Sequence, residues 1–300
     1  MYERAAGVRF ATLEPIFLEL SQAYREGRGI SPATSDTVTA YLATRMPATY
    51  AAAHAALGEL RKRLGSTPVA SVLDAGAGTG AASLAALDWF GPFQITLVER
   101  EPAMAEVARQ VLPEAEIRQE DFIRIREFPP HDLVIASYAL GETPRPEVVS
   151  RLWQAARIAL VVIEPGTPRG FSLISNIRST LLSAGAHMIA PCPGEGPCPL
   201  AVPDWCHFGA RVERTSLHRR LKQAERNYED EKFSYIALGR EAVVTADSRI
   251  ICRPTQQPGL VILETCTPGG VATVRATKRN AAAFRAARRA AWGSEWKQPI

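Results

Sequence analysis

The chain has 300 residues, of which 46% are hydrophobic and 22% are charged, and its formal net charge is +4. These values are typical of a globular protein with a buried core, and no apolar run approaches the roughly 18 residues of a membrane-spanning helix. The first twenty residues include Glu3, Glu14 and Glu19 and lack the cationic and apolar layout of a secretory or transit peptide, which predicts a cytoplasmic protein.

Residues 1–66 are predicted to be helical, because apolar side chains recur there at helical spacing. The two apolar series are Leu13, Ile16, Phe17 and Leu20, and Leu57, Leu60 and Leu64. A turn is expected at Ser31-Pro32, and the stretch Met46-Pro-Ala-Thr-Tyr50 leads into an alanine-rich helix.

From Val69 onward, short apolar runs alternate with helical segments. Strands are expected at 69–73, 95–98, 133–136 and 160–163, and helices at 81–90, 103–112, 147–158 and 171–183. This alternation predicts an α/β fold with a parallel sheet that is covered on both faces. Later strands are expected at 233–238, 250–251, 260–263 and 271–274, with a hairpin turn at Pro268-Gly-Gly270 and a basic helix over 278–292.

The first predicted strand runs into a loop that contains Gly76, Gly78 and Gly80. Glycine lets a backbone turn sharply and approach a ligand without a Cβ atom in the way. The spacing G-x-G-x-G departs from the dinucleotide fingerprint G-x-G-x-x-G. Asp74 at the strand end is placed to orient an ammonium group. Glu99, which ends the second strand, is placed to accept both hydroxyls of a ribose.

This arrangement resembles the class I S-adenosylmethionine-dependent methyltransferases, with their Rossmann-like sheet, over about residues 66–165. The resemblance implies that Asp121 reaches the adenine amino group and that Phe122 lies at the adenine face. The Asn-Pro-Pro-Tyr-type motif of amino-methylating relatives is absent where the fourth strand ends, so no catalytic base is identified. The side chains expected along the cleft are Tyr138, Glu142 and Glu164.

Three of the five cysteines, Cys192, Cys198 and Cys206, fall within fifteen residues of a loop rich in Pro and Gly. Disulfides are disfavoured in a reducing compartment, so several thiols on a proline-stiffened loop predict a metal or iron–sulfur site. The lack of a C-x2–4-C pair counts against zinc. Prolines after Cys192 and Cys198 are typical of ferredoxin ligands.

Three residues compete to be the fourth ligand. Cys266 lies at a strand end beside a turn that allows it to face the loop. Cys252 lies in an apolar run, where a buried and inert thiol is expected. His207 directly follows Cys206 and would point away from it in extended backbone, so we expect it to have a structural role.

Further segments resemble the Rsm-type methyltransferase-like family, which contains a mitochondrial small-ribosomal-subunit assembly protein and its bacterial relatives. They are Met46-Pro-Ala-Thr-Tyr50, Ile163-Glu-Pro-Gly-Thr-Pro168 with Gly170-Phe171, Asp204-Trp-Cys-His-Phe208, Lys278-Arg279 and Ala291-Trp-Gly-Ser294. The resemblance covers nearly the whole chain and implies association with small-subunit rRNA or its assembly intermediate. It also implies a four-iron four-sulfur cluster on Cys192, Cys198, Cys206 and Cys266. Gly194 departs from the family, which often has His after the first Cys-Pro.

Two basic segments favour an anionic partner, RNA in particular. Residues 275–297 hold seven Lys or Arg and one acid, and residues 211–226 hold six Lys or Arg and two Glu.

We therefore expect a monomeric factor in small-subunit assembly that binds S-adenosylmethionine and an iron–sulfur cluster. Its parts are a helical extension over residues 1–66 and a methyltransferase-like domain over 67–300. The latter includes a cysteine-rich metal-binding insertion at about 186–228 and a basic hairpin and helix at about 258–300. An active rRNA methyltransferase is the alternative function, and zinc is the alternative metal. A radical enzyme ranks last, since four protein ligands leave no free iron site.

Overall fold

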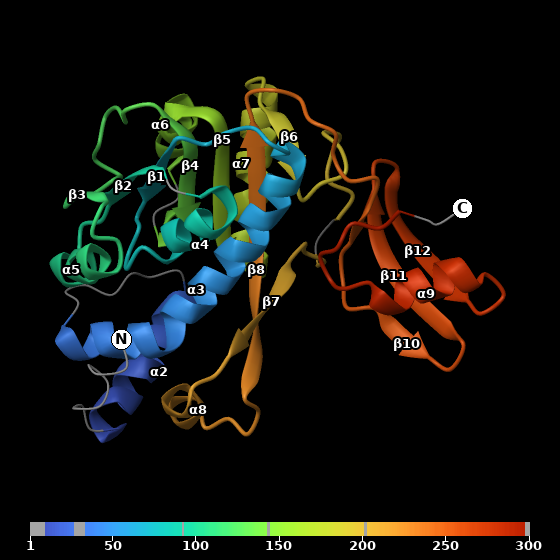
Figure 1. Ribbon diagram of the computed structural model, residues 1–300, viewed down its shortest axis with the longest axis horizontal. Coiled ribbons are helices and arrows are strands. Elements are labelled where there is room, and N and C mark those ends of the chain that lie inside the picture. Colours follow the sequence, from blue (N-terminus) through green and yellow to red (C-terminus); the bar gives the residue numbers. More distant parts are fainter. Residues whose placement is uncertain (1–9, 27–33, 92, 143–144, 201–202, 298–300) are drawn as a thin grey trace.

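A computed structural model describes residues 10–26, 34–91, 93–142, 145–200 and 203–297 of the chain. The strands of its main sheet are β1 (Ser71–Ala75), β2 (Gln94–Val98), β3 (Glu116–Arg118), β4 (His131–Ser137), β5 (Ala156–Pro165), β6 (His187–Ala190), β7 (Phe208–Glu213) and β8 (Tyr228–Gly239). Their order is β3-β2-β1-β4-β5-β8-β6, with β7 also paired to β8 (Figure 1). Strands β1 to β5 are parallel, and β8 runs antiparallel to its neighbours. This is a doubly wound, Rossmann-like sheet, which confirms the predicted α/β class.

Helices cover both faces of the sheet (Figure 1). One face carries α3 (Ser35–Leu64), α4 (Ala81–Phe90) and α5 (Pro102–Val111), and the other carries α6 (Pro146–Ala155) and α7 (Pro168–Ser183). Successive strand residues point to opposite faces, so Leu133 and Ile135 pack toward α3 and α4 while Val134 packs toward α6 and α7. None of the helices in the described ranges is long and apolar enough to cross a membrane.

The expected N-terminal helices are confirmed as α2 (Phe10–Glu26) and α3. Helix α3 begins earlier than predicted and continues through Pro47 as one helix of 30 residues. Its N-cap is Thr34, whose side chain accepts a hydrogen bond from the backbone of Thr37. Proline costs a helix one hydrogen bond, and burial of α3 along the sheet offsets that loss. The turn expected at Ser31-Pro32 lies outside the described residues.

Four strands are absent from the prediction: β3, β6, β7 and β10 (Thr255–Gln257). Strand β3 has only three residues, which is too short for a periodic pattern. Strands β6 and β7 flank the cysteine loop within residues 186–228, and both pair with β8 of the main sheet. The helix expected over 147–158 ends at Ala155, because β5 begins at Ala156 and short apolar runs do not distinguish the two.

A second sheet forms the C-terminal part of the chain, beside the main sheet (Figure 1). It comprises β9 (Arg249–Ile250), β10, β11 (Leu260–Thr267) and β12 (Gly270–Thr277), and α9 (Ala281–Arg289) packs on it. The predicted hairpin is confirmed, because Thr267 pairs with Gly270 across the turn. The closing helix is shorter than the predicted 278–292, since Asn280 caps it by accepting a hydrogen bond from the backbone of Ala283.

Candidate functional site

The glycine loop connects β1 to α4 at the carboxyl ends of the parallel strands, where ligands bind in doubly wound sheets. Gly76, Gly78 and Gly80 all have positive φ angles, of +75°, +56° and +82°. A Cβ atom at Gly76 would lie 2.6 Å from the Cβ of Ala139. The predicted sharp turn therefore exists, and a larger residue at position 76 would collide with the segment that follows β4.

Glu99 holds this loop in place from the end of β2. Its Oε2 accepts a hydrogen bond from the backbone of Gly78 at 2.7 Å, and its Oε1 accepts one from the backbone of Glu101 at 2.8 Å. Burial raises the pKa of this carboxyl. Each oxygen keeps a further lone pair, so the carboxylate is able to accept hydroxyl donors as well.

Asp74 is fully buried at the end of β1. Its Oδ2 accepts a hydrogen bond from Ser83 Oγ at 2.9 Å, whereas its Oδ1 makes no hydrogen bond with any described residue. Burial raises the pKa of Asp74 to about 7 despite the bond from Ser83. An orphaned buried acceptor is rare in folded proteins, and here it fits a cationic donor from a ligand.

Asp121 and Phe122 follow β3 and lie at the same edge of the sheet. Asp121 Oδ1 accepts a hydrogen bond from the backbone of Ile123 at 3.0 Å. The ring of Phe122 is largely buried, and its Cε1 would lie 3.2 Å from a Cβ at Gly76. The structure thus brings Phe122 directly against the glycine loop.

Helix α3 covers the glycine loop, which the sequence pattern did not predict. The hydroxyl of Tyr41 lies 3.7 Å from where a Cβ at Gly78 would be. One turn further on, Arg45 forms a buried ion pair with Glu231 of β8 at 3.0 Å. The hydroxyl of Tyr138 donates to the same carboxylate at 3.3 Å, and Tyr138 itself has a strained φ of +57°.

The side chains that were expected to line the cofactor cleft have different roles in the structure. Glu164 is buried, and its Oε1 accepts hydrogen bonds from the backbones of Leu140 and Gly141. It therefore anchors the 3-10 turn Leu140–Glu142. The side chain of Glu142 lies outside the described part of the structure.

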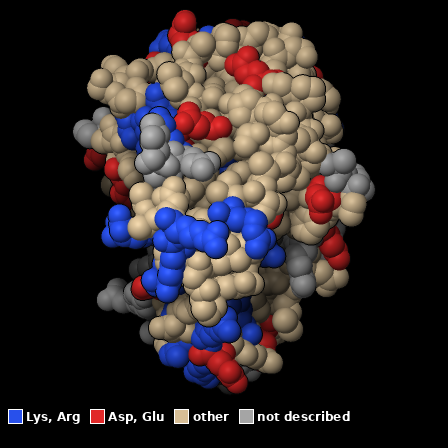
Figure 2. All heavy atoms as spheres, turned by 90° about the vertical axis from the view of Figure 1, so that its right-hand side faces the viewer, with Lys and Arg blue, Asp and Glu red and all other residues tan. Residues whose placement is uncertain are grey.

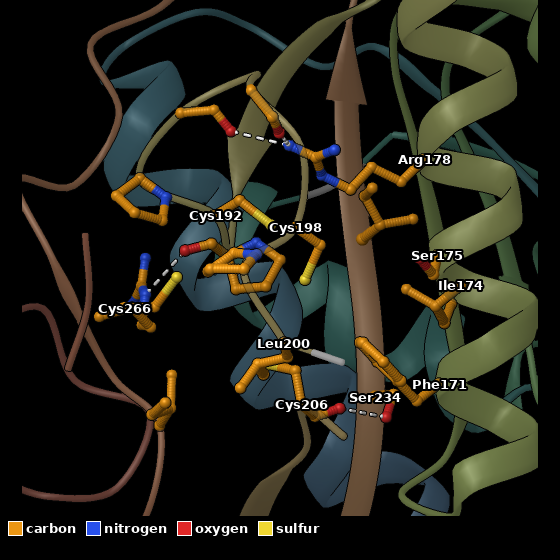
Figure 3. Close-up of a pocket in the computed structure, with 18 of the residues that line it drawn as sticks. Phe171, Ile174, Ser175, Arg178, Cys192, Cys198, Leu200, Cys206, Ser234 and Cys266 are labelled. Carbon is orange, nitrogen blue, oxygen red and sulfur yellow. Dashed lines mark hydrogen bonds between the residues drawn. The ribbon is translucent and has the colours of Figure 1, made fainter. Parts of the chain in front are cut away.

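The cysteine loop runs between β6 and β7 and meets the end of β11. Cys192, Cys198 and Cys206 from this loop and Cys266 from β11 line one cavity of about 160 Å³. Figure 3 shows Cys192 and Cys198 together on the loop, Cys266 on the opposite side and Cys206 beside Ser234. Ser234 Oγ donates to the carbonyl of Cys206 at 2.8 Å and so fixes that end of the loop to β8.

The four thiols affect one another electrostatically. Burial, together with Cys192, Cys198 and Cys266, raises the pKa of Cys206 well above its usual value. Burial raises the pKa of Cys266 to about 11, and Cys192 and Cys198 add to the effect. Burial also raises the pKa of Cys192, against the opposing charge of Arg178. Among the described residues, no three His, Cys, Asp or Glu side chains form a group that could hold a metal ion.

The two competing residues lie away from the cavity wall. Cys252 follows β9 at a half-buried bend. His207 Nδ1 lies 3.2 Å from the carbonyl of Trp205, and its ring stacks on Trp205 and meets the edge of Trp292. His207 therefore packs among aromatic rings.

Three of the six cations of the first basic segment form ion pairs within the fold. Arg214 and Lys222 bind Glu229 at 2.7 and 2.5 Å, and the buried His218 lies 3.2 Å from it. Arg211 pairs with Asp230 at 3.2 Å. These contacts limit the expectation that residues 211–226 present free charge to RNA.

The second basic segment is exposed. Its cations on β12, on α9 and between them that make no ion pair with any described residue are Arg275, Lys278, Arg279, Arg285, Arg288 and Arg289. Figure 2, which views the side of the C-terminal sheet, shows Lys and Arg side chains gathered in a band across the middle of this face and again near its lower end. This surface is the stronger candidate for contact with an anionic polymer.

Residues 35–297 match the family described as Mitochondrial small ribosomal subunit Rsm22. The human mitochondrial ribosome assembly protein METTL17 is 29% identical over 282 residues, which cover 84% of this chain and 61% of that protein. The mitochondrial Rsm22-cox11 tandem protein 2 of Schizosaccharomyces pombe is 25% identical over 323 residues, which cover 87% of this chain and 43% of that protein. The chain thus spans less than two thirds of the length of these relatives.

Two solved methyltransferase structures are similar in fold. The plantazolicin methyltransferase BpumL, in complex with a pentazolic desmethylPZN analog and SAH, gives a TM-score of 0.48 at 12% identity and covers 77% of this chain and 97% of its own. Precorrin-6y C5,15-methyltransferase from Geobacter metallireducens GS-15 gives a TM-score of 0.39 at 16% identity. The match covers 62% of this chain and 86% of that structure's chain.

Proposed function

The chain belongs to the Rsm22 family, and from that membership we propose that it is a small-subunit assembly factor that binds S-adenosylmethionine and a four-iron four-sulfur cluster. The observation that carries this proposal is the convergence of four cysteines from two distant segments on one cavity. The relative METTL17 is named a ribosome assembly protein, which supports the ribosomal part.

The glycine loop supports cofactor binding. Asp74 Oδ1 is a buried acceptor without a partner among the described residues, and it would receive the ammonium of S-adenosylmethionine. Glu99 would accept the ribose hydroxyls, Asp121 the adenine amino group, and Phe122 would contact the adenine face. Gly76, Gly78 and Gly80 have positive φ angles that favour glycine, so this loop carries no Cβ atom where a ligand would approach the backbone. Bound S-adenosylmethionine supplies a transferable methyl group.

We propose that Cys192, Cys198, Cys206 and Cys266 would hold an iron–sulfur cluster; they line one cavity, although among the described residues they do not form a ready metal-binding group. Thiolates that repel one another in a buried space gain stability from a cationic centre, and an all-sulfur donor set suits iron–sulfur clusters or zinc. The described residues 191–200 and 203–207 of the loop belong to no helix or strand, so metal binding would contribute to folding there. The cluster would join the loop between β6 and β7 to β11 of the C-terminal sheet.

We propose small-subunit rRNA, or an assembly intermediate that contains it, as the partner. The exposed cations of β12 and α9 would contact phosphates without first having to break an ion pair within the protein. We further propose a monomer, with residues 1–66 as a helical extension and 67–300 as the methyltransferase-like domain. All five cysteines are free of disulfide bonds.

An active rRNA methyltransferase is the second candidate. The strained φ of Tyr138 at the end of β4 favours it, because such strain clusters at functional sites. The two functions are separated by incubating the protein with methyl-labelled S-adenosylmethionine and immature small subunits. An assembly factor binds the particles and leaves the RNA unlabelled, whereas an enzyme labels it. Failure to bind the particles at low salt would contradict both.

A further inference from the structure

Two buried arginines line the cysteine cavity, and the sequence pattern singled out neither. Arg178 lies on α7 and is 7% exposed, and Arg249 lies on β9 and is 2% exposed. Helix α7 packs on the main sheet, and β9 belongs to the C-terminal sheet. The cavity therefore has one guanidinium on the side of each sheet.

Arg178 fixes the loop that carries the first two cysteines. Its Nη2 donates to the carbonyl of Gly194 at 3.0 Å and to that of Gly196 at 2.6 Å, as Figure 3 shows. Both carbonyls lie between Cys192 and Cys198 in the sequence. The guanidinium thus sets the path of the backbone between these two thiols.

Arg249 fixes the start of the same loop from the other side. Its Nε donates to the carbonyl of Pro191 at 3.0 Å, and its Nη1 donates to Glu59 and to the carbonyl of Gly293. Its Nη2 is buried and makes no hydrogen bond with any described residue. A buried guanidinium nitrogen without a partner is costly, which points to an acceptor that binds in the cavity.

The residues that line the cavity carry more positive than negative charge. The acid among its lining residues is Glu195, whose side chain is exposed and accepts hydrogen bonds from His187 and the backbone of Met188. Glu59 offsets part of the charge of Arg249. Four thiolates around one cluster would add negative charge that the two guanidiniums are placed to balance.

We propose that Arg178 and Arg249 are positioning residues for the cluster: they orient the cysteine loop and balance the charge of the thiolate-ligated centre. This inference rests on the proposed cluster. One-electron reduction would add a negative charge to an already anionic centre, so two buried cations that line the same cavity would favour the reduced form and raise the midpoint potential.

The test compares charge-removing with charge-preserving variants in the full chain. Arg178→Met and Arg249→Met remove the cation, and Arg178→Lys and Arg249→Lys keep it. Arg240→Met is the matched control, because Arg240 also donates to backbone carbonyls but outside the cavity. Iron content is measured first, and the midpoint potential is then measured by titration with dithionite under electron paramagnetic resonance.

We expect both methionine variants to titrate at lower potential than wild type and to lose iron to a chelator several-fold faster. The lysine variants should lie close to wild type, and Arg240→Met should match it. If a methionine variant folds by circular dichroism but does not load iron, loading of its lysine counterpart supports the role of charge. Equal loss of iron in the methionine variant and its lysine counterpart would overturn the role of charge.

Two further outcomes separate this inference from the proposed function. Iron-loaded variants with wild-type potential and wild-type iron retention would overturn the inference alone. Wild-type protein that binds no iron would overturn the cluster and the inference together.

Discussion

Glu59 and Arg249 are 190 residues apart in the sequence, and their side chains meet at 2.5 Å. Glu59 belongs to α3, which covers the main sheet, and Arg249 belongs to β9 of the C-terminal sheet. Their side chains are only 12% and 2% exposed. Because Arg249 also lines the cysteine cavity, this ion pair links the helical covering, the C-terminal sheet and the cysteine loop at one point.

Replacing Glu59 with Gln should lower the free energy of unfolding by about 3 kcal/mol, because it leaves a buried cation without its counter-charge. Urea unfolding at neutral pH measures this change. Glu116→Gln is the control, since Glu116 forms an exposed pair with Arg118 and should lose less than about 1 kcal/mol. Equal losses in the two variants would contradict the role of the buried pair.

The ion cluster around Glu229 should make stability depend on acid pH. Burial raises the pKa of Glu229, but hydrogen bonds from His218, Lys222 and Arg214 outweigh it and hold the pKa well below the ordinary 4.5. A pKa that is lower in the folded state adds stability above about pH 4.5, and this stability is lost as the pH falls further.

Glu229→Gln should therefore be less stable than wild type at pH 7, and the difference should shrink steadily below about pH 4.5. Thermal unfolding over a pH series checks this. Parallel stability curves for the two proteins would show that Glu229 does not carry the effect.

Asp74 should make cofactor affinity depend on pH. Its pKa is raised to about 7 by burial, so lowering the pH below 7 protonates the acceptor that would meet the ligand's ammonium. Titration calorimetry should give weaker binding of S-adenosylmethionine at pH 6 than at pH 8. Asp74→Asn should lower affinity by about tenfold to a hundredfold, the worth of a charged hydrogen bond, and remove the pH dependence.

The control for this prediction is Asp88→Asn, an exposed position on α4 that should leave affinity unchanged. Undiminished binding by Asp74→Asn would remove Asp74 from the cofactor site.

The exposed cations of the C-terminal face should set the salt dependence of RNA binding. About six contacts with single-stranded phosphates give a slope of log affinity against log salt of about −4. Replacing Arg285, Arg288 and Arg289 with Ala should reduce the slope by about 2. Fluorescence anisotropy with a small-subunit rRNA fragment over a salt series measures it.

Arg214→Ala serves as the comparison, because Arg214 is already paired with Glu229. It should destabilise the fold and leave the slope unchanged. A slope that drops with Arg214→Ala and not with the triple variant would place the RNA surface on the first basic segment.

Local patterns predicted the fold class and the position of the main strands, because apolar runs and glycine turns carry that information. The bounds of α4 match the prediction from Ala81 to Phe90. The three-residue β3 and the strands beside the cysteine loop were missed, since their pairing with long partners such as β8 is a tertiary property.

The sequence predicted the parts of the site that one residue type identifies. It did not predict the parts that depend on contacts between residues far apart in the sequence. Spacing and turn position placed Cys266 with the loop cysteines, and the structure brings all four to one cavity. Arg178 and Arg249 were missed, because no local pattern distinguishes a buried arginine from an exposed one. The neutralisation of Arg214 and Lys222 by Glu229 was missed for the same reason.

The central claim is that Cys192, Cys198, Cys206 and Cys266 hold an iron–sulfur cluster. The most direct measurement is the absorption spectrum of anaerobically purified protein, with iron, sulfide and zinc analysis, for wild type, Cys198→Ser and the control Cys252→Ser. We predict iron, sulfide and a broad band near about 400 nm in wild type and Cys252→Ser, and a colourless, partly unfolded Cys198→Ser. Zinc in place of iron in wild type, or a fully folded Cys198→Ser with an unchanged band, would contradict the assignment.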